Sequence, residues 1–215
     1  MKSKLSFSLS LLYALMLLIG SPLRVSGGEP GLLIVGYGDS LMAGYGLPPG
    51  QSFPERLGDW LAERLASPVE VVNAGVSGDT TSGGRARLDW VLAPLGRAPD
   101  LVILELGSND ALRGIDPAIT RENLDAMIAE LRARGSRVLL AGMLAPPNMG
   151  PDYRARFDAI YPELAQKHDV ALYPFFLEGV AADPALNLED GIHPNEKGIA
   201  EMVARIGPRV LAMLE

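Results

Sequence analysis

Leu32-Leu33-Ile34-Val35, an apolar run that leads into Gly38-Asp39-Ser40-Leu41, has the form of a buried strand that ends at a turn carrying a serine. Further apolar runs predict four more strands, near Val69, near Leu101, over 137–142 and over 170–173. Segments with helical periodicity separate these runs. Strand alternating with helix predicts an α/β domain with a parallel sheet that is covered on both faces.

The helical segments carry their own boundary signals. Apolar residues at helical spacing run from Phe53 to Leu61 and from Leu124 to Leu131. Ser52 and Thr120 precede such segments and predict helix starts, because hydroxyl side chains cap the first free N–H groups. Pro162 interrupts the helical pattern of residues 155–167, so we expect a kink there. Clustered prolines and glycines look like loops within one domain.

The end of the chain supplies a possible base for the serine. The sequence contains two histidines, His168 and His193, and a serine nucleophile at neutral pH needs an imidazole as base. His168 lies at the polar end of a predicted helix, where a structural role explains it. His193 follows Asp190 by three residues; taken alone, it could equally be a capping or loop histidine. We therefore predict Ser40 as nucleophile, His193 as base and Asp190 as the residue that orients the base.

The common serine-hydrolase motif is absent. A nucleophile elbow requires Gly-x-Ser-x-Gly, but Met42 occupies the second glycine position after Ser40. The segment Gly75-Val76-Ser77-Gly78-Asp79 fails at Asp79 for the same reason. The ordinary α/β-hydrolase arrangement is therefore excluded.

Two glycine-rich blocks also follow predicted strands. They are Asn73-Ala74-Gly75-Val76-Ser77-Gly78-Asp79-Thr80 and Gly107-Ser108-Asn109-Asp110. Either block alone is more often an ordinary turn between a strand and a helix. Together with the serine block and the Asp190–His193 block, in this order, they form a specific pattern.

This pattern resembles the SGNH, or GDSL, hydrolase family, which is named for Ser, Gly, Asn and His in four separated blocks. Within the family, the motifs are most similar to those of the bacterial periplasmic branch of thioesterases, lysophospholipases and arylesterases. The resemblance implies a three-layer flavodoxin-like fold with a five-stranded parallel sheet in the order 2-1-3-4-5. It also implies an oxyanion hole made by the backbone N–H groups of Ser40 and Gly78 and by the side-chain amide of Asn109. Met42 and Ser108 depart from the family pattern and put substrate fit in question.

The expected function is that of a serine esterase or thioesterase, which hydrolyses acyl esters (acyl thioesters, aryl esters or lysophospholipids) through an acyl-enzyme on Ser40. Asp39 and Asp110 are expected to orient the neighbouring loops by hydrogen bonds. Apolar residues near the expected crevice suggest an acyl-binding site, formed by Tyr45, Leu47, Leu112, Ile115 and Met143.

Three alternatives carry less weight than this function. The same triad could deacetylate O-acetylated carbohydrate, as superfamily relatives do. A non-catalytic binding protein could keep the fold, since fold does not determine function. A metal-dependent hydrolase is disfavoured, because two distant histidines and no cysteine leave few ligands. No cofactor and no metal are expected.

The N-terminus has the layout of a secretory signal peptide. Lys2 and Lys4 precede an apolar run over 5–19, which is short for a membrane span, and small residues end the segment at Gly27. We therefore expect a signal peptide over 1–27, a hydrolase domain over 28–215, export to the periplasm or beyond the cell, and no stable membrane insertion after cleavage.

The charge of the exported part limits its partners. Residues 28–215 contain 16 basic and 26 acidic residues, a net charge of −10. Such a charge argues against nucleic acid and anionic lipid surfaces as partners, and leaves a small acyl ester or thioester as the expected one. The absence of cysteine excludes disulfides. The oligomeric state is open, with a monomer as the expectation.

Overall fold

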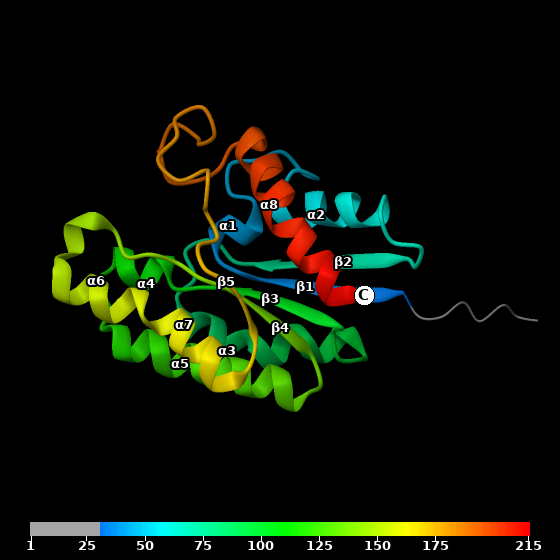
Figure 1. Ribbon diagram of the computed structural model, residues 1–215, viewed down its shortest axis with the longest axis horizontal. Helices are drawn as coiled ribbons and strands as arrows, with labels where there is room; N and C mark the ends of the chain where they lie inside the picture. The colour runs from blue at the N-terminus through cyan, green and yellow to red at the C-terminus, as the bar shows by residue number, and fades with distance from the viewer. Residues whose placement is uncertain (1–30) are drawn as a thin grey trace, which may run out of the picture.

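A computed structural model describes residues 31–215, and the predicted signal peptide over 1–27 lies outside them. The strands form one parallel sheet in the order β2-β1-β3-β4-β5 (Figure 1). They are β1 (Leu32–Gly38), β2 (Val69–Gly75), β3 (Leu101–Glu105), β4 (Arg137–Ala141) and β5 (Ala171–Tyr173). The flavodoxin-like strand order expected from the sequence is confirmed.

Helices cover both faces of the sheet (Figure 1). On one face lie α2 (Phe53–Ala62) and α8 (Glu196–Leu214), and on the other lie α3 (Thr81–Leu92), α5 (Pro117–Ala133), α6 (Pro151–Asp158) and α7 (Ile160–His168). Two short helices, α1 (Ser40–Ala43) and α4 (Ser108–Leu112), follow β1 and β3 almost directly. Two 3₁₀ turns, η1 (Ala93–Leu95) and η2 (Pro147–Met149), complete the elements. None of the helices within 31–215 has the length and hydropathy to cross a membrane.

The core lies on both sides of the central strands. In β1 and β3 the side chains of Ile34, Val35 and Ile103 are fully buried. Burial on both faces explains why these strands read as continuous apolar runs and not as alternating ones. Phe53 of α2 packs edge-on against Phe176, which follows β5, with ring centroids 5.0 Å apart. Aromatic contacts of this kind join one helical layer to the end of the sheet.

One predicted helix start is confirmed and the other is wrong. Ser52 caps α2 in a capping box with Glu55, whose carboxylate accepts the Ser52 N–H at 3.0 Å. The helix predicted to begin at Thr120 begins at Pro117, because Asp116 caps it by accepting the N–H of Ala118. Thr120 is instead buried inside the first turns.

Pro162 has a stronger effect than the expected kink. The helical segment divides at Ala159 into α6 and α7, and Pro162 occupies the first turn of α7. Proline lacks an N–H, and its ring clashes with the carbonyl four residues earlier, so a continuous helix through residue 158 is unfavourable. The first turn of a new helix tolerates the missing donor.

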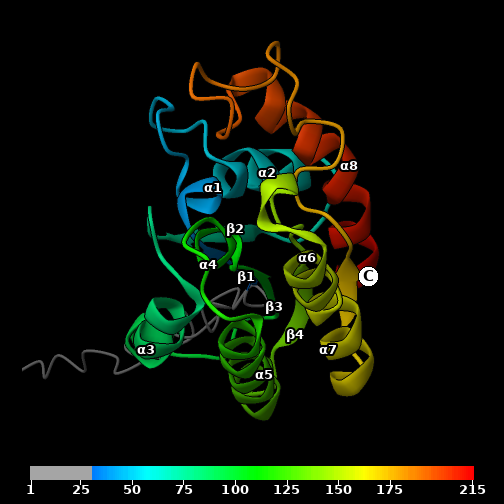
Figure 2. The same cartoon turned by 90° about the vertical axis from the view of Figure 1, so that its left-hand side faces the viewer.

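The carboxyl ends of β1, β2 and β3 lie at the point where the strand order reverses, which is where open α/β sheets bind ligands. Gly38 at the end of β1 is in register with Gly75 at the end of β2. A Cβ at residue 75 would clash with the backbone of Ala43, so glycine allows β2 to lie against α1. Figure 2 views the molecule from this side, where α1 and α4 lie close to the strand ends.

Candidate active site

Ser40, His193 and Asp190 form a continuous chain of hydrogen bonds, although 153 residues separate the first two. The distance from His193 Nε2 to Ser40 Oγ is 2.8 Å, and that from His193 Nδ1 to Asp190 Oδ2 is 2.7 Å. A carboxylate only accepts hydrogen bonds, so Nδ1 carries the proton of the neutral ring and Nε2 accepts from the serine hydroxyl. This is the geometry of a nucleophile with its base and orienting group.

The local loop holds Asp190 as an anion. Its Oδ1 accepts the backbone N–H groups of His193 at 3.0 Å and Ile192 at 2.9 Å. These backbone hydrogen bonds, that of His193 first, lower the pKa of Asp190 from 3.8 to about 2. The spacing Asp-x-x-His therefore allows one carboxylate to orient both the backbone and the ring of His193.

The three expected oxyanion donors lie around the same cavity as Ser40. Ser40 is the first residue of α1, Asn109 lies in the first turn of α4, and Gly78 follows β2 with φ +80°. Ser40, Gly78 and Asn109 all line the cavity. The left-handed conformation at residue 78 favours glycine, because a Cβ is strained there. The strand order thus brings together donors from three separate loops.

A buried carboxylate holds two of these loops together. Asp39 caps α1 by accepting the N–H of Leu41 at 3.0 Å, and its other oxygen accepts the Asn109 amide at 2.9 Å and the Ser108 hydroxyl. Burial raises the pKa of Asp39, while these hydrogen bonds oppose the rise. The hydrogen bonds agree with the loop-orienting role expected of Asp39.

Asp110 of α4 likewise joins separate elements through hydrogen bonds to its carboxylate. Its carboxylate accepts the N–H of Thr81 at 2.8 Å, together with the hydroxyls of Thr81 and Thr120. These bonds join α4 to the starts of α3 and α5. The asparagine that precedes Asp110 is thereby held on a short helix with support from two longer ones.

Sequence reasoning assigned no role to Glu105, the last residue of β3. Its side chain is fully buried, and its Oε2 accepts the Asp39 N–H at 3.2 Å. Burial, followed by the charge of Asp39, raises the pKa of Glu105 well above its ordinary value, which favours the neutral carboxylic acid over the carboxylate. A single glutamate in the apolar run 101–106 is the signal that could have drawn attention to it.

The cavity beside Ser40 has a volume of about 300 Å³ and mainly apolar walls. Of the residues expected to bind substrate, Tyr45, Leu112 and Met143 line it, whereas Leu47 and Ile115 do not. The carbonyl of Ile115 instead accepts the Tyr153 hydroxyl at 2.8 Å. Several wall residues lacked a sequence signal because they come from loops after β4 and β5 and from the His193 loop: Leu144, Pro146, Phe175, Leu177 and Ile192.

The two departures from the family pattern have different environments. Met42 is fully buried and packs close to Gly36 and Gly38 of β1, so it fills the core below α1. Ser108 lines the cavity and donates its hydroxyl hydrogen to Asp39. Of the two, only Ser108 can therefore meet a substrate in the cavity.

His168 is not among the residues that line this cavity, and it has a structural environment. It is the last residue of α7, and its ring is hydrogen-bonded to Asp125 of α5. Within residues 31–215, no group of three or more His, Cys, Asp or Glu side chains has the arrangement of a metal site.

The fold and the triad together define a serine hydrolase built on a doubly wound α/β sheet. A family model described as the GDSL-like Lipase/Acylhydrolase family matches residues 37–200. The chain belongs to this family, so the resemblance seen in the four motifs is confirmed.

Individual relatives agree with this assignment. An arylesterase of Vibrio mimicus is 44% identical over 171 residues, which cover 78% of this chain and 84% of that protein. A thioesterase 1/protease 1/lysophospholipase L1 of Escherichia coli (strain K12) is 41% identical over 177 residues, 81% of each chain. The psychrotrophic esterase EstA from Pseudoalteromonas sp., in a structure inhibited by monoethylphosphonate, is 31% identical with a TM-score of 0.78, covering 85% of this chain and 98% of that one.

Proposed function

We propose that this protein is an exported serine esterase that hydrolyses esters and thioesters of apolar acyl groups through an acyl-enzyme on Ser40. The observation that carries the proposal is the hydrogen-bonded series Asp190–His193–Ser40, which opens onto an apolar cavity. The names of the relatives, an arylesterase and a thioesterase/lysophospholipase, support the same substrate class. The substrate partner is accordingly a small acyl ester or thioester.

Acylation begins when His193 Nε2 takes the proton of Ser40 and Oγ attacks the carbonyl carbon of the ester. Asp190 stabilises the resulting imidazolium and holds its Nδ1–H in place. His193 then gives the proton to the departing alcohol or thiol. Water, deprotonated by the same imidazole, attacks the carbonyl carbon of the acyl-enzyme. The bond between that carbon and Ser40 Oγ then breaks, His193 returns the proton to Oγ, and the carboxylic acid leaves.

The oxyanion formed in each step needs donors aimed at it. The backbone N–H groups of Ser40 and Gly78 and one N–H of the Asn109 amide are the proposed donors. Because Asn109 gives one hydrogen to Asp39, its second amide hydrogen is available for the substrate. Loss of one such donor typically costs about 2.7–4 kcal/mol of transition-state stabilisation.

The walls of the cavity favour an acyl chain over a sugar. Aliphatic and aromatic side chains from the segments after β1, β3, β4 and β5 and from the His193 loop line the space next to the nucleophile. Each methylene that they cover contributes about 0.8 kcal/mol. A carbohydrate ester would require polar partners for its hydroxyl groups, so the O-acetyl esterase alternative has less support here.

A serine-reactive fluorophosphonate tests the assignment of the nucleophile. We expect mass spectrometry to find one label, on Ser40, and Ser40→Ala to lose both labelling and ester hydrolysis. Ser77→Ala is the matched control, because Ser77 lines the same cavity and should be dispensable. A label on Ser77 or Ser108, or full activity of Ser40→Ala, would reject the mechanism.

The substrate and the destination of the protein need separate tests. p-Nitrophenyl esters of increasing chain length, run beside acyl-CoA, lysophospholipid and acetylated xylan, rank the substrate classes. A strong preference for acetyl groups would favour the carbohydrate esterase.

Export is tested by fractionating cells that express the full chain. We expect a product shortened by 27 residues outside the cytoplasm, and an uncleaved cytoplasmic product would contradict this expectation. Gel filtration tests the expected monomer.

A further inference from the structure

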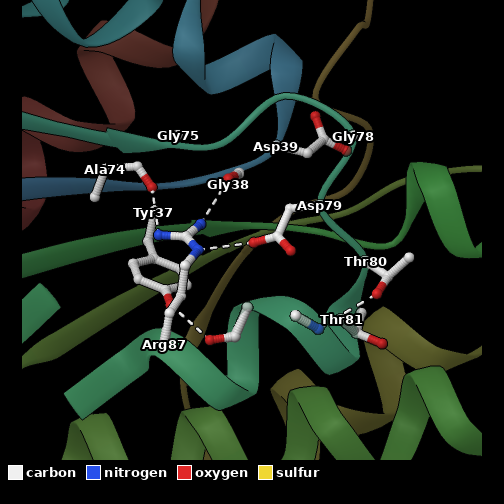
Figure 3. Close-up of polar contacts among 12 residues, drawn as sticks. Tyr37, Gly38, Asp39, Ala74, Gly75, Gly78, Asp79, Thr80, Thr81 and Arg87 are labelled. Atoms are coloured by element: carbon white, nitrogen blue, oxygen red, sulfur yellow. Dashed lines mark hydrogen bonds and ion pairs between the residues drawn. The ribbon is translucent and has the colours of Figure 1, made fainter. Parts of the chain in front are cut away.

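The guanidinium of Arg87, on α3, makes hydrogen bonds through all three of its nitrogens at the carboxyl end of the sheet (Figure 3). Its Nε donates to Asp79 Oδ2 at 2.7 Å, and its two terminal nitrogens donate to the carbonyls of Ala74 and Gly38, each at 2.9 Å. The ion pair is largely buried, with 16% of the Arg87 side chain and 11% of the Asp79 side chain exposed. Arg87 therefore joins the ends of β1 and β2 to the loop that follows β2.

That loop is a tight turn, and Arg87 binds the side chain of its last residue, Asp79. The turn begins at Val76, whose N–H donates to the Gly38 carbonyl at 3.0 Å, and it is closed by the Asp79 N–H, which donates to the Val76 carbonyl at 3.0 Å. Gly78 lies inside the turn. Its first residue is thus anchored on the Gly38 carbonyl, and its last residue is anchored on Arg87, which holds the same carbonyl.

Two nearby residues, Tyr37 and Gly83, accommodate the Arg87 side chain and its ion pair. Its guanidinium lies over the ring of Tyr37, 4.1 Å from the centroid, and the Tyr37 hydroxyl donates to the Gly84 carbonyl at 2.6 Å. Burial raises the pKa of Tyr37, so the phenol keeps the proton that it donates. A Cβ at residue 83 would clash with the Asp79 carboxylate, so the glycine there leaves room for the ion pair.

We propose that Arg87 is a positioning residue of the oxyanion hole, which fixes the backbone N–H groups of Ser40 and Gly78 relative to each other. Gly38 is two residues before Ser40, and Asp79 directly follows Gly78, so Arg87 reaches one anchor beside each donor. Arg87 is not among the residues that line the cavity, so it acts on the transition state through the loops and not by touching substrate. This inference rests on the proposed function.

Three variants test the role. Arg87→Met keeps an unbranched apolar stem and removes every donor, while Arg87→Lys keeps the charge but cannot reproduce the planar fork of donors. The matched control is Arg56→Met on α2, because Arg56 pairs with the exposed Asp59 at the surface. Circular dichroism and urea denaturation establish that each variant is folded at the assay temperature.

Deletion of one oxyanion donor lowers kcat by about 10²–10³. Since Arg87→Met displaces donors without deleting them, we expect kcat for p-nitrophenyl esters to fall about tenfold to a hundredfold, with KM changed less than about twofold. The kcat of Arg87→Lys should fall between those of Arg87→Met and the wild type, and the kcat of Arg56→Met should match that of the wild type.

A pair of inhibitors separates positioning from general damage. An alkyl trifluoromethyl ketone adds to the Ser40 oxygen: the new C–O bond forms, the carbonyl electron pair moves to the oxyanion, and His193 takes the serine proton. Its Ki should rise by the same factor as kcat/KM falls, while the Ki of the corresponding trifluoromethyl carbinol, which forms no oxyanion, should stay within about twofold.

Wild-type kcat in folded Arg87→Met, or equal weakening of ketone and carbinol, would overturn the inference. If Arg87→Met does not fold, Arg87→Lys replaces it in the test. Wild-type kcat in Arg87→Lys, or equal weakening of ketone and carbinol, would then overturn the inference. The activity of Ser40→Ala distinguishes a failure of the positioning role of Arg87 from a failure of the proposed function. An inactive Ser40→Ala beside a fully active Arg87→Met rejects only the positioning role, whereas an active Ser40→Ala rejects the proposed function itself.

Discussion

Replacing Glu105 by glutamine should change how the stability of the protein depends on pH. Glu105 is fully buried, and its Oε1 has no hydrogen-bond partner within residues 31–215. Burial and the charge of Asp39 raise its pKa well above the ordinary value of 4.5. As the pH rises past 4.5, the unfolded chain releases this proton while the native protein keeps it.

The magnitude follows from that difference of one proton. Above pH 4.5 the native state binds one proton more than the unfolded state, so the Glu105 contribution to the free energy of unfolding falls by about 1.4 kcal/mol per pH unit. This contribution is fully present below pH 4.5 and is lost as the pH rises to the native pKa of Glu105, where the slope ends. Glutamine has nearly the same volume, offers an acceptor for the Asp39 N–H, and does not titrate.

The assay is urea denaturation of wild type and Glu105→Gln at a series of pH values from 5 upward. The difference in unfolding free energy, wild type minus variant, should fall by about 1.4 kcal/mol per pH unit until native Glu105 ionises. Ile103→Val, buried in the same strand, is the control and should cost about 0.5–1.5 kcal/mol at every pH. A constant difference for Glu105→Gln, or one that grows with pH, would refute the reasoning.

Three further predictions concern the reaction. Asp190→Asn should lower kcat for ester hydrolysis by roughly 10⁴, because an amide donor facing Nδ1 of His193 places the ring proton on Nε2; a loss below tenfold would contradict this. Leu112→Ala should lower kcat/KM several-fold more for octanoyl than for acetyl esters, whereas Ile119→Ala, an exposed residue outside the cavity, should affect neither; equal losses on both esters would show that Leu112 does not contact the chain. Activity should survive prolonged dialysis against EDTA, and a loss restored by Zn²⁺ or Mn²⁺ would reject the metal-free mechanism.

The strands and the proposed catalytic trio were accessible from the sequence for physical reasons, whereas the strand order was expected from the family resemblance. Buried parallel strands must be apolar along their whole length, so the runs at Leu32 and Leu101 could be recognised locally. Because only two histidines exist, the choice of base was narrow, and Asp190 lies close enough to His193 in the chain for the pairing to be local. The start of α2 could be predicted for the same reason, because the Ser52 cap involves only neighbouring residues.

The tertiary structure alone decided the features that depend on contacts between distant segments. Arg87 reaches carbonyls 13 and 49 residues away, and Glu105 meets Asp39 across 66 residues. Phe175 and Leu177 enter the cavity wall only because β5 ends beside it, and Ile115 is missing from that wall because its loop turns away. The sequence of a segment determines its preference for helix, strand or turn. Hydrogen bonds and cavity walls formed between distant segments depend on how the layers pack, and this packing cannot be read from any one segment.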